Sequence, residues 1–500
     1  MLFLTLFFIA AVSVQGYAAQ QETYELENPL NEAYLKKKLK KQSPRLILNS
    51  KIDRNLKKKL KTDPVVKSFY QVLKADAGKI NELPLLERVM RGRRMSTAET
   101  RIRLSTLGMV YHLGKDPEIL DRLNREILAV CTFPDWNPSH YLDVAGTALA
   151  VALAIDWAGE DLPQKTVELA KEALIEKGIL PSFNEEYNWW VDCHHNWNQV
   201  CHAGMVGAAI VVAEKDPQLA AKTIGRALDN MGLALVEYGP DGVYPEGATY
   251  WGFGTMHTIM TVSMLNSAFG NDFGISNFPG FMESADFVPL LTAPSGEFYN
   301  FYDCGSNLLE NNRGSGNAAV AMFNRSSIAV NLLWFALQTG NSFYFDESYF
   351  TDQDENRRRQ YFDAAALVWL SRFEENNNTQ LPSAWKGEGL NPLVIFRGET
   401  NDPDMFYLGA KGGKASNNHG NMDAGSFIFE LDGIRWSIDL GNQSYNELEQ
   451  AGFDLWNNDQ DSERWTLLTK SNFGHSTISV NNQLHFVDGK ATITNYREDE

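Results

Sequence analysis

The sequence predicts two structural parts, an N-terminal α/α barrel or toroid and a C-terminal antiparallel sheet. Long apolar stretches alternate with amphipathic ones between residues 97 and 270, as in helical hairpins whose inner members are buried. From about residue 390 the apolar residues occur in short alternating runs separated by turn residues. At 500 residues the chain is also too long for one ordinary core, so a multidomain protein is expected.

The first residues have the pattern of a secretory signal. An apolar run over 2–12 is followed by small residues at Gly16 and Ala18, as a cleavage site requires, although no Lys or Arg precedes the run. The run is short for a membrane span, and no cysteine stands at the cleavage point to carry a lipid anchor. We therefore expect a signal over 1–18, export to the periplasm or cell exterior, and no membrane span.

A helical lead-in and the helices of the toroid follow. The lead-in, expected over 19–96, is rich in Lys and ends in the run Arg91-Gly92-Arg93-Arg94, which has the pattern of a solvated charged surface. The toroid is expected over 97–385, where Thr97 and Glu99 give a helix start signal. Buried helices are expected over 142–157, 200–213 and 257–269, and amphipathic partners after the turns at 161–163 and 216–217.

The C-terminal part, expected over 386–500, has the pattern of strands joined by tight turns. Asp432-Gly433 is a hairpin signal, and alternation continues on its return strand. The last apolar run ends close to Glu500 with no closing element, so we expect the sheet domain to continue beyond that residue. Strands are expected over 393–396, 405–408, 426–431, 434–438, 477–480, 484–487 and 491–496.

Composition limits the partners. The net charge of −18 argues against a nucleic-acid partner, because phosphate contacts need a basic surface. An anionic sugar is not excluded, since local Arg, Lys and amide groups can bind carboxylates in an acidic protein. The 12 Trp and 18 Tyr exceed what a core requires and are typical of sugar sites, although the core remains the ordinary location of any one of them. The four cysteines are expected as buried free thiols, with one bridge, such as Cys193 to Cys201, as the alternative.

Three polar segments stand apart from the core pattern and are expected to meet in one cleft. The longest, 417–427, contains His419 among small polar residues that offer it no apolar packing, which favours a functional histidine. The segment 194–198 precedes a buried helix, where Asn is also a good N-cap. The segment 244–251 contains Tyr250 among glycines that permit close approach to the backbone, with a core tyrosine as the alternative.

These segments resemble the signature blocks of one enzyme family when taken together and in order. The runs are Asn-Trp-Asn-x-Val-Cys at 196–201, Glu-Gly-x-x-Tyr-Trp at 246–251 and His-x-x-x-Asp-Ala-Gly-Ser-Phe at 419–427. They resemble the heparinase II/III-like polysaccharide lyases, and the resemblance covers about 98–496. It implies an α/α toroid followed by an antiparallel β-sandwich. It also implies β-elimination of a uronate in an acidic polysaccharide such as heparin, heparan sulfate or alginate, with no organic cofactor.

The resemblance assigns roles to individual residues. Tyr250 would protonate the leaving C4 oxygen and, for one substrate epimer, also take the C5 proton, while His419 would be the other base. Asn196 would neutralise the substrate carboxylate, with His195 as its rival, because the C5 proton is weakly acidic until that charge is neutralised. Substrate contacts are expected from neighbouring residues, namely Trp197, Asn198, Glu246, Trp251, Asn418 and Arg464. For sulfate recognition, Arg313 and Arg397 are candidates beside Arg464.

Some members of that family hold a structural zinc ion in the sandwich. Asp439 and His475 match two of its ligands. The third ligand there is a histidine two residues after the catalytic one, and here that position is Asn421. Zinc binding and its absence are therefore equal alternatives.

Two other functions compete with the lyase. A glycoside hydrolase on an α/α barrel needs two carboxylates flanking the bond. Glu246, Asp303 and Asp423 are candidates, although none is paired in a motif. A non-catalytic acidic-glycan-binding protein would keep the fold without turnover. The sequence favours no single uronate polymer, no endo or exo action and no oligomeric state.

Overall fold

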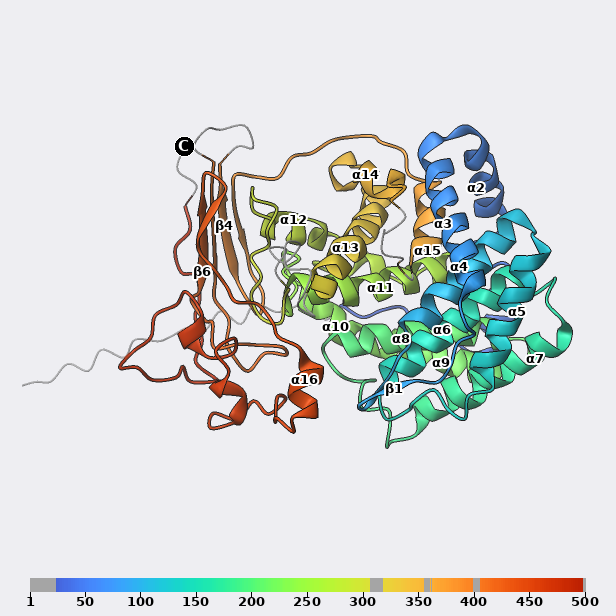
Figure 1. Ribbon diagram of the computed structural model, residues 1–500, viewed down its shortest axis with the longest axis horizontal. Coiled ribbons are helices and arrows are strands. Elements are labelled where there is room, and N and C mark those ends of the chain that lie inside the picture. Colours follow the sequence, from blue (N-terminus) through green and yellow to red (C-terminus); the bar gives the residue numbers. More distant parts are fainter. Residues whose placement is uncertain (1–23, 306–317, 355–359, 361, 399–404, 498–500) are drawn as a thin grey trace, which may run out of the picture.

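The computed structural model describes residues 24–305, 318–354, 360, 362–398 and 405–497, without the side chains of 318–327. The signal expected over 1–18 and the candidate Arg313 lie outside these residues. Figure 1 shows the helices gathered at one end of the molecule and the sheet at the other.

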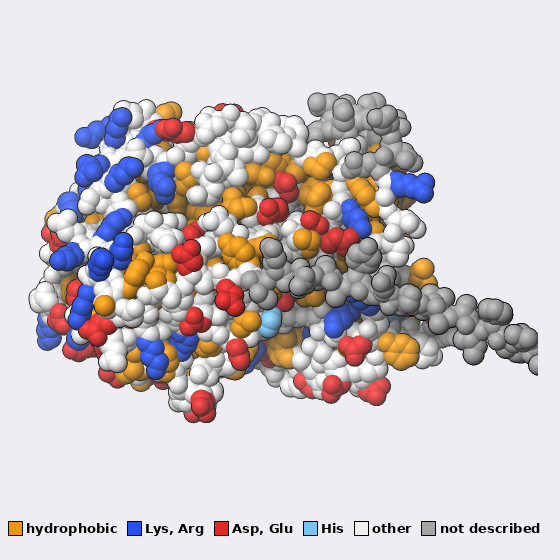
Figure 2. Space-filling model, turned by 180° about the vertical axis from the view of Figure 1, so that it is seen from behind, with side chains coloured by type: hydrophobic (Ala, Val, Ile, Leu, Met, Phe, Trp, Pro, Cys, Tyr) orange, Lys and Arg blue, Asp and Glu red, His pale blue; other side chains and the backbone are white. Residues whose placement is uncertain are grey.

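The lead-in forms three helices and a small hairpin. Many Lys and Arg side chains lie over this end of the molecule, where the Lys-rich α2 is found (Figure 2). The hairpin carries Arg93 and Arg94 toward the C-terminal part, where both contact Glu449. The elements are α1 (Glu32–Lys38), α2 (Ser50–Thr62), α3 (Pro64–Glu82), β1 (Met90–Arg91) and β2 (Arg94–Met95).

Inner and outer helices form an incomplete α/α toroid. The inner helices pack consecutively and are buried almost all round: α4 (Ala98–Gly114), α6 (Tyr141–Ala158), α8 (Asn196–Val212) and α11 (Gly247–Phe269). The amphipathic outer helices are α5 (Pro117–Cys131), α7 (Gln164–Ala173) and α9 (Pro217–Asn230). Asp216 starts α9 by accepting a hydrogen bond from the Leu219 amide, as the Asp-Pro signal predicts. Gly204 allows α8 to approach α6, because a Cβ there would lie 2.4 Å from the Ala145 carbonyl oxygen.

The remaining helices connect the toroid to the sheet. They are α10 (Gly232–Leu235), α12 (Phe287–Leu291), α13 (Ala318–Thr339), α14 (Glu347–Thr351) and α15 (Asp363–Leu370), with α16 (Tyr445–Gln450) after the sheet. One helix of the described residues, Tyr141–Ala158, has the length and apolar character of a membrane span, but 94% of it is buried inside the fold. Burial of that kind is typical of a core helix. All four cysteines are unpaired, as expected.

Five consecutive antiparallel strands form the sheet, which confirms the predicted fold class of helical toroid and antiparallel sheet. The strands are β3 (Ala384–Gly387), β4 (Leu393–Arg397), β5 (Phe406–Lys411), β6 (Phe427–Leu431) and β7 (Ile434–Ser437). The predicted hairpin is confirmed at Asp432 and Gly433, whose φ angles of 53° and 73° suit a tight turn. The sheet and the helices share one hydrophobic core, in which Tyr407 donates a hydrogen bond to the Leu290 carbonyl at 3.0 Å.

The prediction of strands between residues 477 and 496 is wrong. These residues form short turns and irregular segments, and their one β-bridge joins Ala491 to Gly413. No strand of the described residues pairs with this stretch, and its apolar side chains Ile478 and Phe486 are 80% and 79% exposed. The described residues therefore contain one layer of the expected sandwich.

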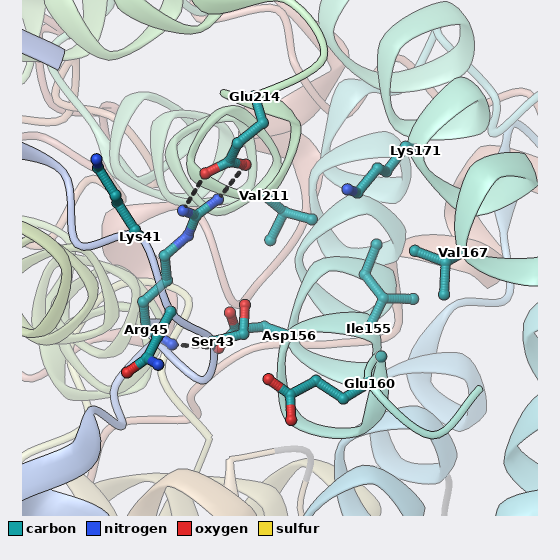
Figure 3. Close-up of a pocket in the computed structure, with 12 residues that line it drawn as sticks. Lys41, Ser43, Arg45, Ile155, Asp156, Glu160, Val167, Lys171, Val211 and Glu214 are labelled. Carbon is teal, nitrogen blue, oxygen red and sulfur yellow. Dashed lines mark hydrogen bonds and ion pairs between the residues drawn. The ribbon is translucent and has the colours of Figure 1, made fainter. Parts of the chain in front are cut away.

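A polar cavity of about 350 Å³ lies between the lead-in and the inner helices (Figure 3). The Arg45 guanidinium binds both oxygens of Glu214 at the end of α8. Asp156 of α6 accepts hydrogen bonds from the backbone amides of Arg45 and Leu46, both at 2.8 Å. These contacts fasten the lead-in to two inner helices, and no residue of the three sequence motifs lines the cavity.

Candidate active site

The three polar segments meet around a second cavity, of about 550 Å³, between the toroid and the C-terminal part. The β1–β2 hairpin and α16 also contribute residues to its wall. Seven of the residues expected at the site line it: His195, Asn196, Trp197, Tyr250, Asn418, His419 and Arg464.

Local backbone structure directs the key side chains. His195 is the N-cap of α8, so Asn196 and Trp197 lie in the first turn of that helix. Gly247 starts α11 with a φ of 83°, and a Cβ there would lie 3.0 Å from the Phe301 carbonyl oxygen. His419 has a left-handed φ of 56°, which is uncommon outside glycine and marks a position fixed by its surroundings.

Tyr250 and His419 form a stacked pair. Their ring centroids are 3.8 Å apart and their planes are inclined by 19°. The hydroxyl of Tyr445, on α16, lies 3.2 Å from the Tyr250 hydroxyl and 3.4 Å from His419 Nδ1. A possible proton donor and a possible proton acceptor are thus in contact on one wall of the cavity.

Two carboxylates flank the His419 ring without lining the cavity. Asp303 Oδ2 lies 2.8 Å from Nδ1, and the other oxygen of Asp303 pairs with Lys470. Glu246 Oε2 lies 3.6 Å from Nε2. Both acids are buried beneath the cavity surface.

Glu246 organises the polar floor. It accepts hydrogen bonds from the Asn196 backbone amide at 3.0 Å, the Asn196 side chain at 2.6 Å and the Asn418 side chain at 2.7 Å. Tyr244 also donates to it, at 3.0 Å. Glu246 was expected to contact the substrate, but it is only 2% exposed and does not face the cavity. Its role in the structure is to hold Asn196 and Asn418 in place.

Three arginines line the cavity, namely Arg93, Arg94 and Arg464, and no carboxylate among the described residues does. Arg464 is almost fully buried and donates to the backbone carbonyls of Leu455 and Gly420, both at 2.7 Å. Within the described chain it forms no ion pair with a carboxylate. Burial lowers the pKa of Arg464 to about 10, so the guanidinium remains charged at neutral pH.

The pKa values of the stacked pair move apart. Burial lowers the pKa of His419 to about 4, with Glu246 opposing the shift and Arg464 and Arg94 adding to it. Burial raises the pKa of Tyr250 above its ordinary value. At neutral pH the pair therefore consists of a neutral imidazole and a protonated phenol, which are the states of a general base and a general acid.

Some predicted contacts are not where the sequence suggested. Trp251 is fully buried and stacks on Phe335, and Asn198 is buried with its amide bound to the carbonyls of Val191 and Asn230. Neither lines the cavity, and the candidate Arg397 on β4 does not either.

Sequence reasoning missed Tyr445, Trp456, Arg93 and Arg94 as wall residues, and Asp303 as the partner of His419. Only the arginines have a signal in the sequence, the charge run at 91–94, whose pattern predicts a solvated surface. Tyr445 and Trp456 reach the wall through tertiary folding of α16 and the segment after it.

The possible metal ligands form a buried group in the C-terminal part. Asp439 Oδ2 lies 3.0 Å from His475 Nδ1, and Asp423 also has a ligand atom within 4.8 Å of theirs. Asn421 is fully buried, and both polar atoms of its side chain lack hydrogen-bond partners among the described residues. Asp423 Oδ2 and His475 Nε2 lack hydrogen-bond partners among the described residues. Lys411 Nζ, 2.7 Å from Asp423 Oδ1, already supplies one positive charge. Buried nitrogen and oxygen atoms without partners fit a zinc ion, which Asp423, Asp439 and His475 would hold.

No family model and no curated protein matches the chain. Solved structures that are similar to it include a heparinase III, with 12% identity, a TM-score of 0.46 and coverage of 90% of this chain and 71% of that one. An alginate lyase from Bacteroides ovatus has 10% identity, a TM-score of 0.43 and coverage of 65% and 99%. A chondroitin AC lyase from Streptomyces coelicolor A3 has 11% identity, a TM-score of 0.43 and coverage of 78% and 58%.

The chain spans 54% of the length of another heparinase III that it matches. At these identities and TM-scores, the likeness carries no information about the substrate or the reaction of this chain.

Proposed function

We propose that this chain is a polysaccharide lyase that cleaves a uronate-containing acidic polysaccharide by β-elimination, in the manner of the heparinase II/III-like enzymes that its motifs resemble. One observation carries the proposal. The cavity around Tyr250 and His419 is lined by no described carboxylate and by three arginines, in a protein of net charge −18. Arg93 and Arg94 pair with Glu449, whereas Arg464 has no carboxylate partner among the described residues. Such a lining attracts an anion against the charge of the whole molecule.

The proposed reaction uses the stacked pair. Nε2 of neutral His419 takes the C5 proton, the electron pair of that bond forms the C4–C5 double bond, and the C4–O4 bond breaks. Tyr250 gives its hydroxyl proton to the leaving oxygen. The lowered pKa of His419 and the raised pKa of Tyr250 support these roles at neutral pH. The proton on Nε2 then leaves to solvent and the Tyr250 phenolate takes up a proton, which restores both groups. Tyr445 contacts the Tyr250 hydroxyl and His419 Nδ1.

Arg464 is the proposed partner of the uronate carboxylate. The charge of its guanidinium is not neutralised by any described carboxylate, and a fixed positive group beside C5 would stabilise the enolate that forms there. The amide of Asn196, which the family resemblance assigns to this role, is held by Glu246 at 2.6 Å. Asn196 and His195 therefore remain proposed as secondary contacts to the carboxylate.

A glycoside hydrolase has less support. It needs two carboxylates on opposite sides of the scissile bond, whereas Glu246 and Asp303 lie behind His419 and Asp423 pairs with Lys411. A glycan-binding protein without turnover would retain the arginines but would not depend on the states of Tyr250 and His419. Export to the periplasm or cell exterior is part of the proposal and is supported by the N-terminal sequence alone.

Ultraviolet absorbance of the C4–C5 double bond tests the proposal. The protein is incubated in turn with heparin, heparan sulfate, hyaluronan, chondroitin, alginate and pectate. We expect absorbance to rise on at least one polymer, and to stay flat with Tyr250→Phe and His419→Ala although both variants still bind that polymer. Tyr344→Phe is the matched control, because Tyr344 also makes a partly buried hydrogen bond through its hydroxyl, to Asp286, away from the cavity.

New reducing ends without absorbance would contradict the lyase and favour the hydrolase. Binding without either product by the unmodified protein would favour the glycan-binding alternative.

A further inference from the structure

Asp303 and Lys470 form a buried ion pair directly behind His419. Asp303 Oδ2 lies 2.8 Å from His419 Nδ1, and Asp303 Oδ1 contacts the Lys470 ammonium group. Both side chains are 0% exposed, and neither lines the cavity. Asp303 therefore touches the proposed base but has no access to a bound sugar.

We infer that Asp303, held by Lys470, is a positioning residue that fixes the Nδ1–H tautomer of His419 and supports its protonated form; this inference rests on the proposed lyase function. An ionised carboxylate can only accept a hydrogen bond, so the proton of the neutral ring must lie on Nδ1. The lone pair is then on Nε2, the atom that is available to take a proton.

Lys470 keeps the carboxylate in the form that this role needs. A buried carboxylate without a counter-charge tends to take up a proton, and it could then donate to Nδ1 instead of accepting. Burial lowers the pKa of Lys470 to about 7, so its ammonium form prevails below neutral pH and there favours the ionised carboxylate. Lys470 also accepts a hydrogen bond from the Met422 amide at 2.8 Å through its backbone carbonyl, so one residue anchors both Asp303 and the loop that carries His419.

The pair also balances charge during the reaction. When the C5–H bond breaks and a proton arrives on Nε2, the imidazolium ring has a carboxylate 2.8 Å from its other nitrogen, and Asp303 itself takes no proton. Among the described residues, the other titratable or charged groups near the ring are Glu246, Tyr250, Tyr445, His195, Arg94 and Arg464. Of these, only Glu246 is a second carboxylate, and it lies farther away, at 3.6 Å.

The test compares Asp303→Asn and Asp303→Glu with the unmodified protein. Nitrogen-15 NMR of the His419 ring reports the tautomer, with His419→Gln identifying the signal. Lyase kinetics over a pH range report kcat, KM and the acid limb of the pH–rate profile, where activity falls as His419 becomes protonated. The control is Glu126→Gln, which alters another fully buried carboxylate, paired with Arg122 and Arg103 and remote from the cavity.

We expect Asp303→Asn to lose the Nδ1–H tautomer and to lower kcat by about 10²–10⁴-fold with KM nearly unchanged. The acid limb should move to lower pH, because removing a nearby negative charge makes His419 harder to protonate. Asp303→Glu should recover part of kcat. Glu126→Gln should leave the tautomer and the limb unchanged, even where it lowers the melting temperature.

An unchanged tautomer and kcat in Asp303→Asn would overturn the inference, as would a rise in KM alone. If that variant does not fold, Lys470→Met provides the same measurement. Without its partner, Asp303 should become protonated, and it would then no longer hold the ring proton of His419 on Nδ1. The unmodified protein could form no unsaturated product on any polymer while Asp303→Asn still loses the Nδ1–H tautomer. That result would support the contact between Asp303 and His419 and would reject the lyase function.

Discussion

The imidazole ring of His419 lies almost flat against the phenol ring of Tyr250, with 3.8 Å between their centroids and 19° between their planes. A pyranose ring cannot fit between two groups at that separation. Asp303 holds the imidazole at 2.8 Å, and Tyr445 contacts both partners. The proposed base and acid must therefore approach a bound sugar from the same side.

The stack predicts selectivity for the configuration at C5. D-glucuronate and D-mannuronate have the C5 hydrogen and the C4 oxygen on the same face, whereas their C5 epimers, L-iduronate and L-guluronate, have them on opposite faces. We expect initial rates to be higher on chondroitin than on dermatan, or on polymannuronate than on polyguluronate, by about 10²-fold, because misplaced reacting groups cost rates of that order. Ultraviolet initial rates on these matched polymers measure it, and equal rates on both epimers would contradict it.

Arg464 is predicted to be needed for activity beyond its structural hydrogen bonds. Arg464→Met removes the positive charge next to the proposed site, so kcat/KM should fall by about 10²–10³-fold. Arg464→Lys keeps the charge and should retain more activity. The matched control is Arg226→Met, because Arg226 is another largely buried arginine that donates to a backbone carbonyl, that of Ser182, away from the cavity. Equal losses in both Met variants would indicate a purely structural role.

The buried group of Asp423, Asp439 and His475 predicts one zinc ion per chain. Elemental analysis of protein prepared without added metal should find it, and chelation should lower the melting temperature. His475→Ala should remove both the metal and the effect of the chelator, since it deletes the one nitrogen ligand of the group. A metal-free protein whose melting temperature does not respond to added zinc would show instead that Lys411 alone balances the two carboxylates.

The sequence predicted the elements whose hydrophobic pattern is determined locally. The inner helices and the strands β4 to β7 are examples, because burial on all sides or on one face leaves a readable period. Where alternation is not matched by a pairing strand, as between 477 and 496, the same pattern gave strands that do not form. Strand pairing is a tertiary property that alternation alone does not supply.

Membership of a sequence motif did not predict which side chains point into the cavity. Tyr250 lines the cavity and Trp251 is buried in the core, because successive residues of a helix point about 100° apart. Asn196 and Asn198 differ for the same reason. Asp303 and Tyr445 lie in segments without a motif, and only the packing of the C-terminal part against the toroid brings them to His419.

Asp156 predicts that the stability of the lead-in contact depends on pH. Burial raises the pKa of its carboxyl to about 6, against the opposing effect of the backbone amides of Leu46 and Arg45. In the unfolded chain the pKa is about 3.9. The folded state therefore binds the proton more tightly, and stability is lost as pH rises from about 4 to about 6, by up to about 3 kcal/mol.

Asp156→Asn should remove this dependence, because an amide oxygen can accept the same two backbone hydrogen bonds without carrying charge. Melting temperatures measured from pH 4 to pH 8 should show the variant more stable than the unmodified protein above pH 6 and equal to it near pH 4. Glu160→Gln, an exposed neighbour in the same cavity, should follow the unmodified protein throughout. A variant less stable at every pH would mean that Asp156 is ionised and stabilising, with the amide donors outweighing the cost of burial.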